Sequence, residues 1–259
     1  MKLLTCLSLF LFTVNPTAAA GQDDLRAKAE EVISAAIQAM GGQKYLDVKS
    51  SHSAGRYFVF SKQGKGFAKY WDWTVYDPVK WRFQQGEGKR QSVSIYNLEL
   101  GKAWTLEGQD EDAKIEEISE EQIKDWMEGV KSDLNFLLKQ RFDEEGMNLY
   151  YYGPDDIAGS GQYEAVEFLD SGNKSVVVYF DRQNHLPHMV ETHSTDKFGV
   201  RRKQETEFYN WHVIEGVKTP LRLDYLVEGE LSQQYHLDLI TYNPPIPPDH
   251  FLEPQLKKK

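Results

Sequence analysis

The residue types best suited to chemistry in this sequence are its histidines, but their spacing does not form a site. The seven are His52, His185, His188, His193, His212, His236 and His250. Only His185 and His188 lie close together, and Pro187 stands between them. A zinc pair needs a helical or rigid hairpin spacing and a third ligand, which His193 could supply only in a favourable hairpin. We therefore predict no metal site, and we interpret the histidines as exposed strand and turn residues.

Other catalytic patterns are incomplete. Ser160 stands in Gly-Ser-Gly without the strand, elbow and helix of a hydrolase nucleophile. The segment 64–66, Gly-Lys-Gly, lacks the further glycine and the helix of a phosphate loop. The pair Asp155-Asp156 is one of many carboxylate pairs in an acidic chain and does not indicate glycoside chemistry. Because no nucleophile, base and orienting group can be assembled, we predict a protein that is not an enzyme and has no cofactor. A hydrolase is the least favoured alternative.

The first 20 residues have the pattern of a signal peptide. Met1-Lys2 is a short basic start, 3–14 is apolar, and Ala18-Ala19-Ala20 offers small residues for cleavage. The alternative is a buried N-terminal helix; the apolar run is too short to span a bilayer. The single cysteine, Cys6, lies in this segment, so the mature chain has neither a disulfide nor a thiol nucleophile. We predict a periplasmic protein whose residues 21–259 form one domain.

The charge balance excludes some partners. The formal net charge is −10, and removal of residues 1–20 would remove one positive charge. This balance argues against nucleic acid and against adhesion to anionic lipid headgroups, but not against binding acyl chains. The stretch 107–121 holds many acidic residues and one lysine. It is interpreted as a solvated loop, and a surface for a basic partner is the alternative.

Two helices and a series of strands are predicted. Apolar residues at helical spacing predict a helix over Asp24–Met40, which Gly41-Gly42 ends. Ser119 and Gln122 form a capping box for a second helix, which continues to about Arg141. Period-2 alternation and short turns predict strands over 51–61, 67–76, 81–83, 92–96, 103–106, 149–152, 163–169, 175–181, 187–193, 200–211, 218–227 and 231–242.

The order of these elements defines the fold class. Helices that interrupt antiparallel strands predict an α+β fold with the helices packed on one face, and a sheet of about 11 strands must curl or close. In the 175–193 hairpin, Asp181 is interpreted as a turn former rather than as an acid or base. The proline-rich tail from Asn243 is predicted to cross the sheet edge and to pin Phe251 against it.

Aromatic residues are the best functional candidates. In the strand 70–76, Trp71, Trp73 and Val75 share one face, and Tyr70, Asp72, Thr74 and Tyr76 share the other. Part of this apolar surface is predicted to line a cavity that binds an acyl chain. An ordinary sheet–helix core is the alternative. The predicted cavity-lining residues are Phe58, Phe60, Trp71, Trp73, Trp81, Phe83, Trp104, Leu106, Trp126 and Met127.

Four segments resemble a known family. They are 35–42 at the end of the first helix, the strand–turn–strand Tyr179–Pro187, the hairpin 211–220 and the closing segment 243–254. In order and spacing they are similar to exported proteins of the outer-membrane lipoprotein-sorting type, the lipoprotein carrier-like superfamily. The resemblance implies a strongly curved, half-open antiparallel β-barrel, with helices on its concave face as a lid over an apolar cavity.

The predicted function follows from this resemblance and from the missing chemistry. We expect a monomeric periplasmic protein that holds lipid or lipoprotein acyl chains, in outer-membrane lipoprotein sorting or lipid transport, as a chaperone rather than a catalyst. An envelope membrane protein is a further candidate partner. The alternative is a non-catalytic envelope-stress or protein-interaction scaffold on the same fold, in which the acidic stretch 107–121 contacts a basic partner.

Overall fold

The structure, a computed structural model, describes residues 17–61, 64–108, 113–155, 161–195 and 198–255. Most of the predicted signal peptide, Ser160, Asp156 and part of the acidic stretch lie outside the described residues. No helix within those ranges is both long and apolar enough to cross a membrane.

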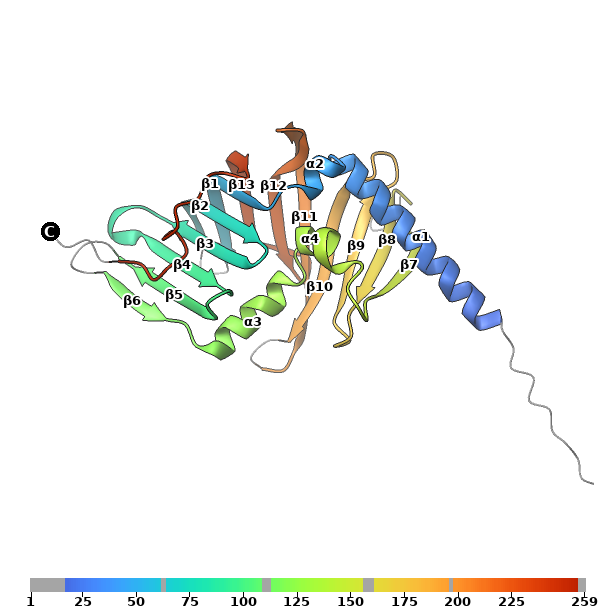
Figure 1. Cartoon of the computed structure of the whole chain (residues 1–259), viewed down its shortest axis with the longest axis horizontal. Helices are drawn as coiled ribbons and strands as arrows, with labels where there is room; N and C mark the ends of the chain where they lie inside the picture. Colours follow the sequence, from blue (N-terminus) through green and yellow to red (C-terminus); the bar gives the residue numbers. More distant parts are fainter. Residues whose placement is uncertain (1–16, 62–63, 109–112, 156–160, 196–197, 256–259) are drawn as a thin grey trace, which may run out of the picture.

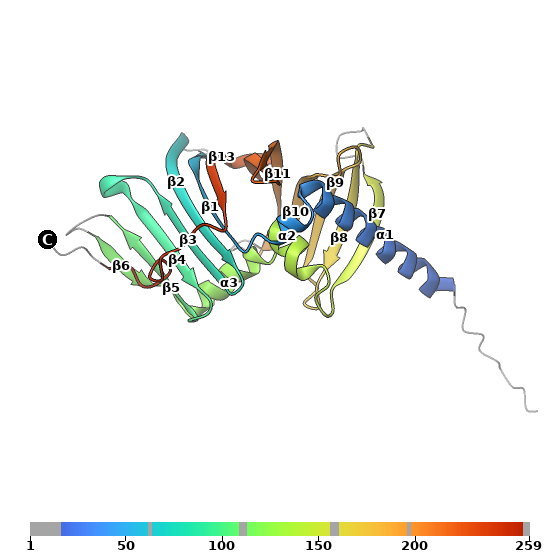
Figure 2. The ribbon, with the colours of Figure 1, turned by 45° about the horizontal axis from the view of Figure 1, so that its top comes forward.

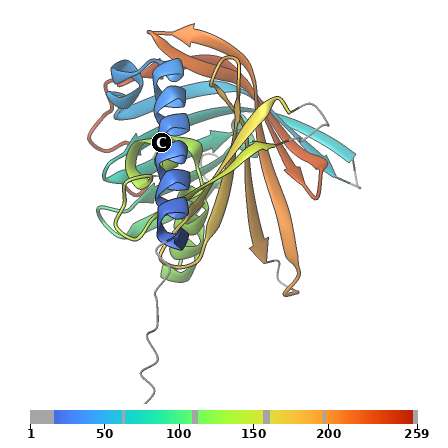
Figure 3. The same ribbon diagram turned by 90° about the vertical axis from the view of Figure 1, so that its right-hand side faces the viewer.

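The fold is dominated by one antiparallel sheet of 13 strands in the order β6-β5-β4-β3-β2-β1-β13-β12-β11-β10-β9-β8-β7. Figure 1 shows the strands in this order from left to right, and Figure 3 shows the curvature of the sheet. The sheet is not closed, since β6 and β7 end the order. The strands are β1 (Ser50–Ser61), β2 (Gly64–Tyr76), β3 (Val79–Gln85), β4 (Ser92–Asn97), β5 (Lys102–Glu107), β6 (Lys114–Glu117), β7 (Asn148–Asp155), β8 (Tyr163–Leu169), β9 (Ser175–Asp181), β10 (Pro187–Thr195), β11 (Arg201–Ile214), β12 (Val217–Val227) and β13 (Glu230–Tyr242).

The antiparallel sheet with a few helices confirms the predicted class at this level. Of the 13 strands, β6 has no counterpart in the prediction, because it lies in the acidic stretch interpreted as a loop. It pairs with β5, and its Ile115 lies opposite Leu106. One apolar side chain in a four-residue strand is too weak a pattern to reveal the pairing in the sequence.

The β9–β10 hairpin forms as predicted. Asp181 accepts hydrogen bonds from the backbone N–H groups of Gln183, at 2.8 Å, and Asn184, at 3.0 Å. His185 takes a positive φ of 59° in the same turn. Asp181 is therefore a turn former, because its carboxylate satisfies the backbone donors of the reversal.

The helices are α1 (Thr17–Met40), α2 (Gln43–Leu46), α3 (Glu120–Val130) and α4 (Leu134–Phe136), followed by the π-helical turn η3 (Leu137–Arg141); η1 (Gly88–Arg90) is a short 3₁₀ turn. The first predicted helix is confirmed, and α1 extends it to Thr17, inside the predicted signal segment.

The second predicted helix is broken in two. Ser119 forms the predicted capping box with Gln122, but α3 ends at Val130. Asp133 then begins α4, accepting from the backbone N–H groups of Asn135 at 2.8 Å and Phe136 at 3.3 Å. The carboxylate at a new N-cap lets the chain change direction, so the prediction of one helix to Arg141 was wrong.

Helices pack against one of the two faces of the sheet and fill one half of it. We call this whole face of the sheet the inner face. The main core joins side chains of α1 and of the α4–η3 segment to strands β7–β11, with Ile33, Leu137, Phe168, Val178 and Phe180 among its buried members. Figures 1 and 3 show α1 lying along this half of the molecule. These contacts leave the inner face of β1–β3, β12 and β13 without a comparable helical cover.

The opposite, outer face is covered by the C-terminal tail. The tail runs across the strands β2–β5 (Figures 1 and 2). Phe251 is 5% exposed and packs with Val93, Ile95 and Trp104. Asn97 Nδ2 donates to the Phe251 carbonyl at 3.2 Å. Phe251 is therefore pinned as predicted, but on a sheet face rather than at the sheet edge.

Candidate functional site: a cavity on the inner face

A cavity of about 700 Å³ lies on the inner face of the sheet. Its walls come from β1–β3, from β10–β13 and from the α3–η3 segment. The residues that line it follow from strand alternation. Every second side chain of a strand points to the same face, and residues paired across neighbouring strands share that face. The aromatic residues that line it are Tyr45, Tyr70, Tyr76, Trp81, Phe83, Trp126, Phe136, Phe208, Trp211, Tyr225, Tyr235 and Tyr242.

Stacked rings form one wall of the cavity. The Phe83 ring lies between Tyr70, with centroids 5.8 Å apart, and Trp81, at 5.5 Å. Tyr235 meets Tyr70 edge-on at 5.3 Å. Trp126 of α3 reaches this wall and lies 5.7 Å from Trp81. Because these stacked rings expose mainly carbon atoms, this wall of the cavity is largely apolar.

A carboxylate, Asp72, stands within the aromatic wall. Its Oδ2 accepts from Trp81 Nε1 at 2.6 Å and its Oδ1 from Thr74 Oγ1 at 3.1 Å. Burial raises the pKa of Asp72 to about 6, although these two hydrogen bonds oppose the shift. Desolvation dominates because two neutral donors do not replace the hydration of a carboxylate.

A second polar group lies where η3 meets the cavity. Lys139 Nζ is 4.5 Å from the ring centroids of both Tyr45 and Tyr76, and it donates to the Val48 carbonyl at 3.2 Å. Burial lowers the pKa of Lys139 to about 8, while the nearby Asp133 opposes the shift. The two groups partly neutralise each other.

The predicted cavity residues divide between the two faces. Trp81, Phe83 and Trp126 line the cavity. The structure places the others elsewhere: Phe58, Phe60, Trp71 and Trp73 on the outer face of β1 and β2, Trp104 and Leu106 on the outer face of β5, and Met127 on α3 away from the cavity walls.

The choice of face in β2 explains this division. The prediction chose Trp71 and Trp73, which are the larger apolar side chains, as the cavity face. Trp73 instead packs with the outer cluster beneath the C-terminal tail. The inner face carries Tyr70, Asp72 and Thr74. Sequence reasoning missed these residues because tyrosine and aspartate at alternate positions resemble the polar, solvated side of a strand.

Four of the seven histidines, His52, His188, His236 and His250, are half-buried rather than exposed as predicted. His52 stacks on Trp73 with centroids 4.5 Å apart, and His250 meets the same indole edge-on at 4.7 Å. Their Nε2 atoms are buried. Burial lowers the pKa of His250 to about 4, with nearby Arg82 as a further cause. Among the described residues, no group of three histidine, cysteine, aspartate or glutamate side chains could hold a metal ion.

Comparisons with known proteins give a likeness of fold. No family model matches the sequence, and no curated protein matches it. A solved DUF1329 family protein from Desulfovibrio piger is similar with a TM-score of 0.54 at 11% identity, over 86% of this chain and 96% of that one.

Two further solved structures align with similar shares of this chain and of their own chains. An outer membrane lipoprotein-sorting protein domain from Vibrio parahaemolyticus has a TM-score of 0.46 at 12% identity, over 86% of this chain and 97% of that one. A LolA superfamily protein from Nitrosomonas europaea has a TM-score of 0.45 at 16% identity, over 86% and 96%. Of the three, the DUF1329 family protein has a TM-score above 0.5, and at 11% identity this likeness shows a shared fold.

Proposed function

We propose that this chain is an exported periplasmic binding protein that holds lipid or lipoprotein acyl chains in the inner cavity. The main observation behind this proposal is that helices fill only part of the inner face of the sheet. Helices fill the inner face over β7–β9 and part of β10 and β11, whereas the rest of this face keeps a cavity of about 700 Å³ with largely aromatic and aliphatic walls. A cavity of this size and lining is typical of small-molecule sites. The proposed role is outer-membrane lipoprotein sorting or lipid transport, without a catalytic step.

Burial of the chain would supply the affinity. Each methylene removed from water contributes about 0.8 kcal/mol, so eight methylenes contribute roughly 6 kcal/mol before the cost of ordering the ligand. The proposal includes a monomer with residues 1–20 as a cleaved signal peptide and 21–259 as one domain.

In this proposal α3 acts as a lid. Trp126, Gly129 and Val130 of α3 border the cavity. Ile123 is the one buried residue of this helix, and Trp126 stacks on Tyr96 with centroids 4.1 Å apart. So few contacts make α3 a better candidate for movement than α1, whose apolar side is buried in the main core.

Native mass spectrometry of protein purified without detergent tests the proposal. We expect a bound lipid, and we expect delipidated protein to bind a fluorescent fatty acid. Phe83→Ala should weaken this binding because Phe83 lines the cavity, whereas Phe58→Ala on the outer face should leave it unchanged. A protein that is free of lipid and binds no fluorescent fatty acid would refute the proposal.

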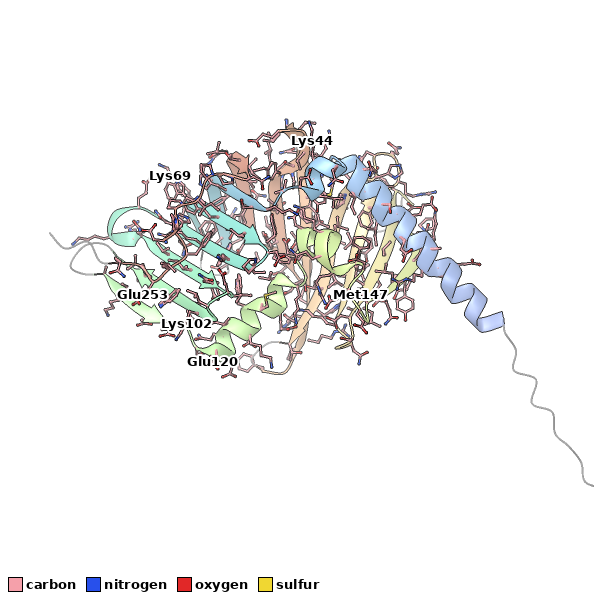
Figure 4. All side chains as sticks on the ribbon, in the orientation of Figure 1. Lys44, Lys69, Lys102, Glu120, Met147 and Glu253 are labelled. Carbon is pink, nitrogen blue, oxygen red and sulfur yellow. The ribbon has the colours of Figure 1, made fainter. Side chains whose placement is uncertain are left out.

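A scaffold role is the second candidate, favoured by one surface. Glu116 and Glu117 of the edge strand β6 and Glu120 and Glu121 of α3 are exposed. Figure 4 shows Glu120 at the start of α3. A basic partner would bind this surface in a salt-dependent way. Pull-down from envelope extracts at low and high salt separates the two roles, because a carrier should release lipid rather than protein as its main ligand.

A further inference from the structure

Asp72 is placed among neutral neighbours by the register of the sheet. Phe83 lies directly across from it on β3 and Ser53 directly across on β1. On its own strand, Tyr70 and Thr74 occupy the adjacent positions of the same face. The carboxylate therefore opens into the cavity from a wall that offers it hydrocarbon and hydroxyl groups.

The charge of Asp72 is not matched within the described residues. No lysine, arginine or histidine described in the structure forms an ion pair with it, in contrast to Asp224, which Arg222 contacts, and to Glu205, which Lys203 contacts. A carboxylate has about four acceptor positions, and Trp81 and Thr74 fill two of them. Asp72 is half-buried. A partly desolvated charge without a counter-ion is costly, so a ligand that supplies one gains affinity.

We propose that the inner cavity selects amphiphiles that carry a protonated amine, and that this ammonium group pairs with Asp72 while the alkyl chain lies along the stacked rings. This inference rests on the proposed function and names its class of ligand. An ammonium group fits because it donates up to three hydrogen bonds and carries the missing charge.

Other headgroups fit this wall less well. An anionic group beside Asp72 would meet like charge. Two lysines line the cavity, Lys139 and Lys218. Lys139 already donates to the Val48 carbonyl, lies over two tyrosine rings and interacts electrostatically with Asp133. A bare divalent cation needs six or more oxygen ligands, and no group of three acidic, histidine or cysteine side chains that could hold a metal occurs in the described ranges.

The test compares three ligands with the same chain: dodecylamine, dodecanol and dodecanoic acid, each below its micelle concentration, competing with a fluorescent fatty acid at pH 8. We expect dodecylamine to bind about tenfold or more tightly than dodecanol, and the acid to bind most weakly. In Asp72→Asn, which keeps the side-chain shape, the amine and the alcohol should bind equally. Asp125→Asn, an exposed change on α3, is the matched control and should keep the preference.

A pH series on the unchanged protein gives a second readout. Burial, with the charge of Asp133 as a further cause, raises the pKa of Asp72 to about 6. The amine preference should therefore be full at pH 8 and should fall as the pH drops through 6, where the amine itself stays protonated. The other charged residues that line the cavity are Asp133, Lys139, Glu205 and Lys218. Equal binding of amine and alcohol, or a preference that survives Asp72→Asn, would overturn the inference and leave the proposed function intact. Binding of none of the three compounds, with no binding of the fluorescent fatty acid, would overturn both.

Discussion

Asp72 is the residue where stability and binding oppose each other. Its carboxylate is desolvated on the cavity wall, and two neutral donors hold it in place. Such a group costs folding free energy when it ionises, and it stays in the structure only because the surrounding sheet fixes it. Binding sites commonly contain polar groups of this kind, with perturbed pKa values and a defined orientation.

The pH dependence of folding follows from the raised pKa of Asp72. Because the folded pKa, about 6, lies above the ordinary value of 3.8, the stabilising effect of the protonated form is complete below about pH 4. It is lost as the pH rises through 6, and the loss amounts to at most about 3 kcal/mol. Urea unfolding should therefore show Asp72→Asn to be more stable than the unchanged protein at pH 8 but not at pH 4. A variant that is equally destabilised at both pH values would contradict this assignment.

At the scale of elements, the C-terminal tail determines which sheet face is closed. Its described part has no helix or strand, yet Phe251 packs against Val93, Ile95 and Trp104. Asn97 donates a hydrogen bond to the Phe251 carbonyl, and Arg82 donates one to the His250 carbonyl. A Pro-rich segment suits this position because it requires few backbone partners.

We predict that Phe251→Ala lowers the free energy of unfolding by about 3–5 kcal/mol, the range for loss of a buried aromatic ring. The neighbouring Leu252 is 44% exposed, so Leu252→Ala should change stability by less than about 0.5 kcal/mol. Denaturant unfolding of both variants measures the difference. Similar small effects in the two variants would show that the tail is not part of the folded core.

The lid proposed for α3 gives a kinetic prediction. Trp126→Ala removes the stacking on Tyr96 and the contact with Trp81. Aromatic pairs of this kind contribute about 0.5–1.5 kcal/mol, so release of a fluorescent fatty acid should be about 2- to 10-fold faster in stopped-flow measurements. Met127→Ala, on the same helix but away from the cavity walls, serves as the control and should leave the release rate unchanged. An unchanged rate in Trp126→Ala would exclude α3 as the lid.

At the scale of the whole molecule, one continuous sheet forms both the main core and a wall of the cavity. Over β7–β9 the inner face forms a filled core with α1 and η3, and over β1–β3, β12 and β13 it borders the cavity; β10 and β11 contribute to both. The filled part can supply stability while the other part remains open. The two meet at residues such as Met40, Val190 and Phe208, which belong to the core and also line the cavity.

This division predicts that stability and binding can be changed separately. Ile33 of α1 is fully buried in the filled half, so Ile33→Ala should lower the free energy of unfolding by about 2–5 kcal/mol. Ligand affinity, measured without denaturant at a temperature where the variant is folded, should stay within about twofold of the unchanged protein. A parallel loss of affinity would show that the two halves are coupled.

The sequence by itself determined the local elements. The capping box at Ser119, the turn at Asp181 and the apolar side of α1 each follow from interactions within a few residues, and the structure contains all three. The period-2 pattern likewise located all the strands except β6, whose four residues carry one apolar side chain.

The tertiary structure decided which side of the sheet is the cavity. Alternation along β2 separates Trp71 and Trp73 from Tyr70 and Asp72, but it does not determine which of the two faces lines the cavity. The outer face is closed by Phe251, which lies far away in the sequence, and the inner face is left open where the helices end. Contacts between such distant segments depend on packing in three dimensions, and hydrophobic periodicity within one strand carries no information about them.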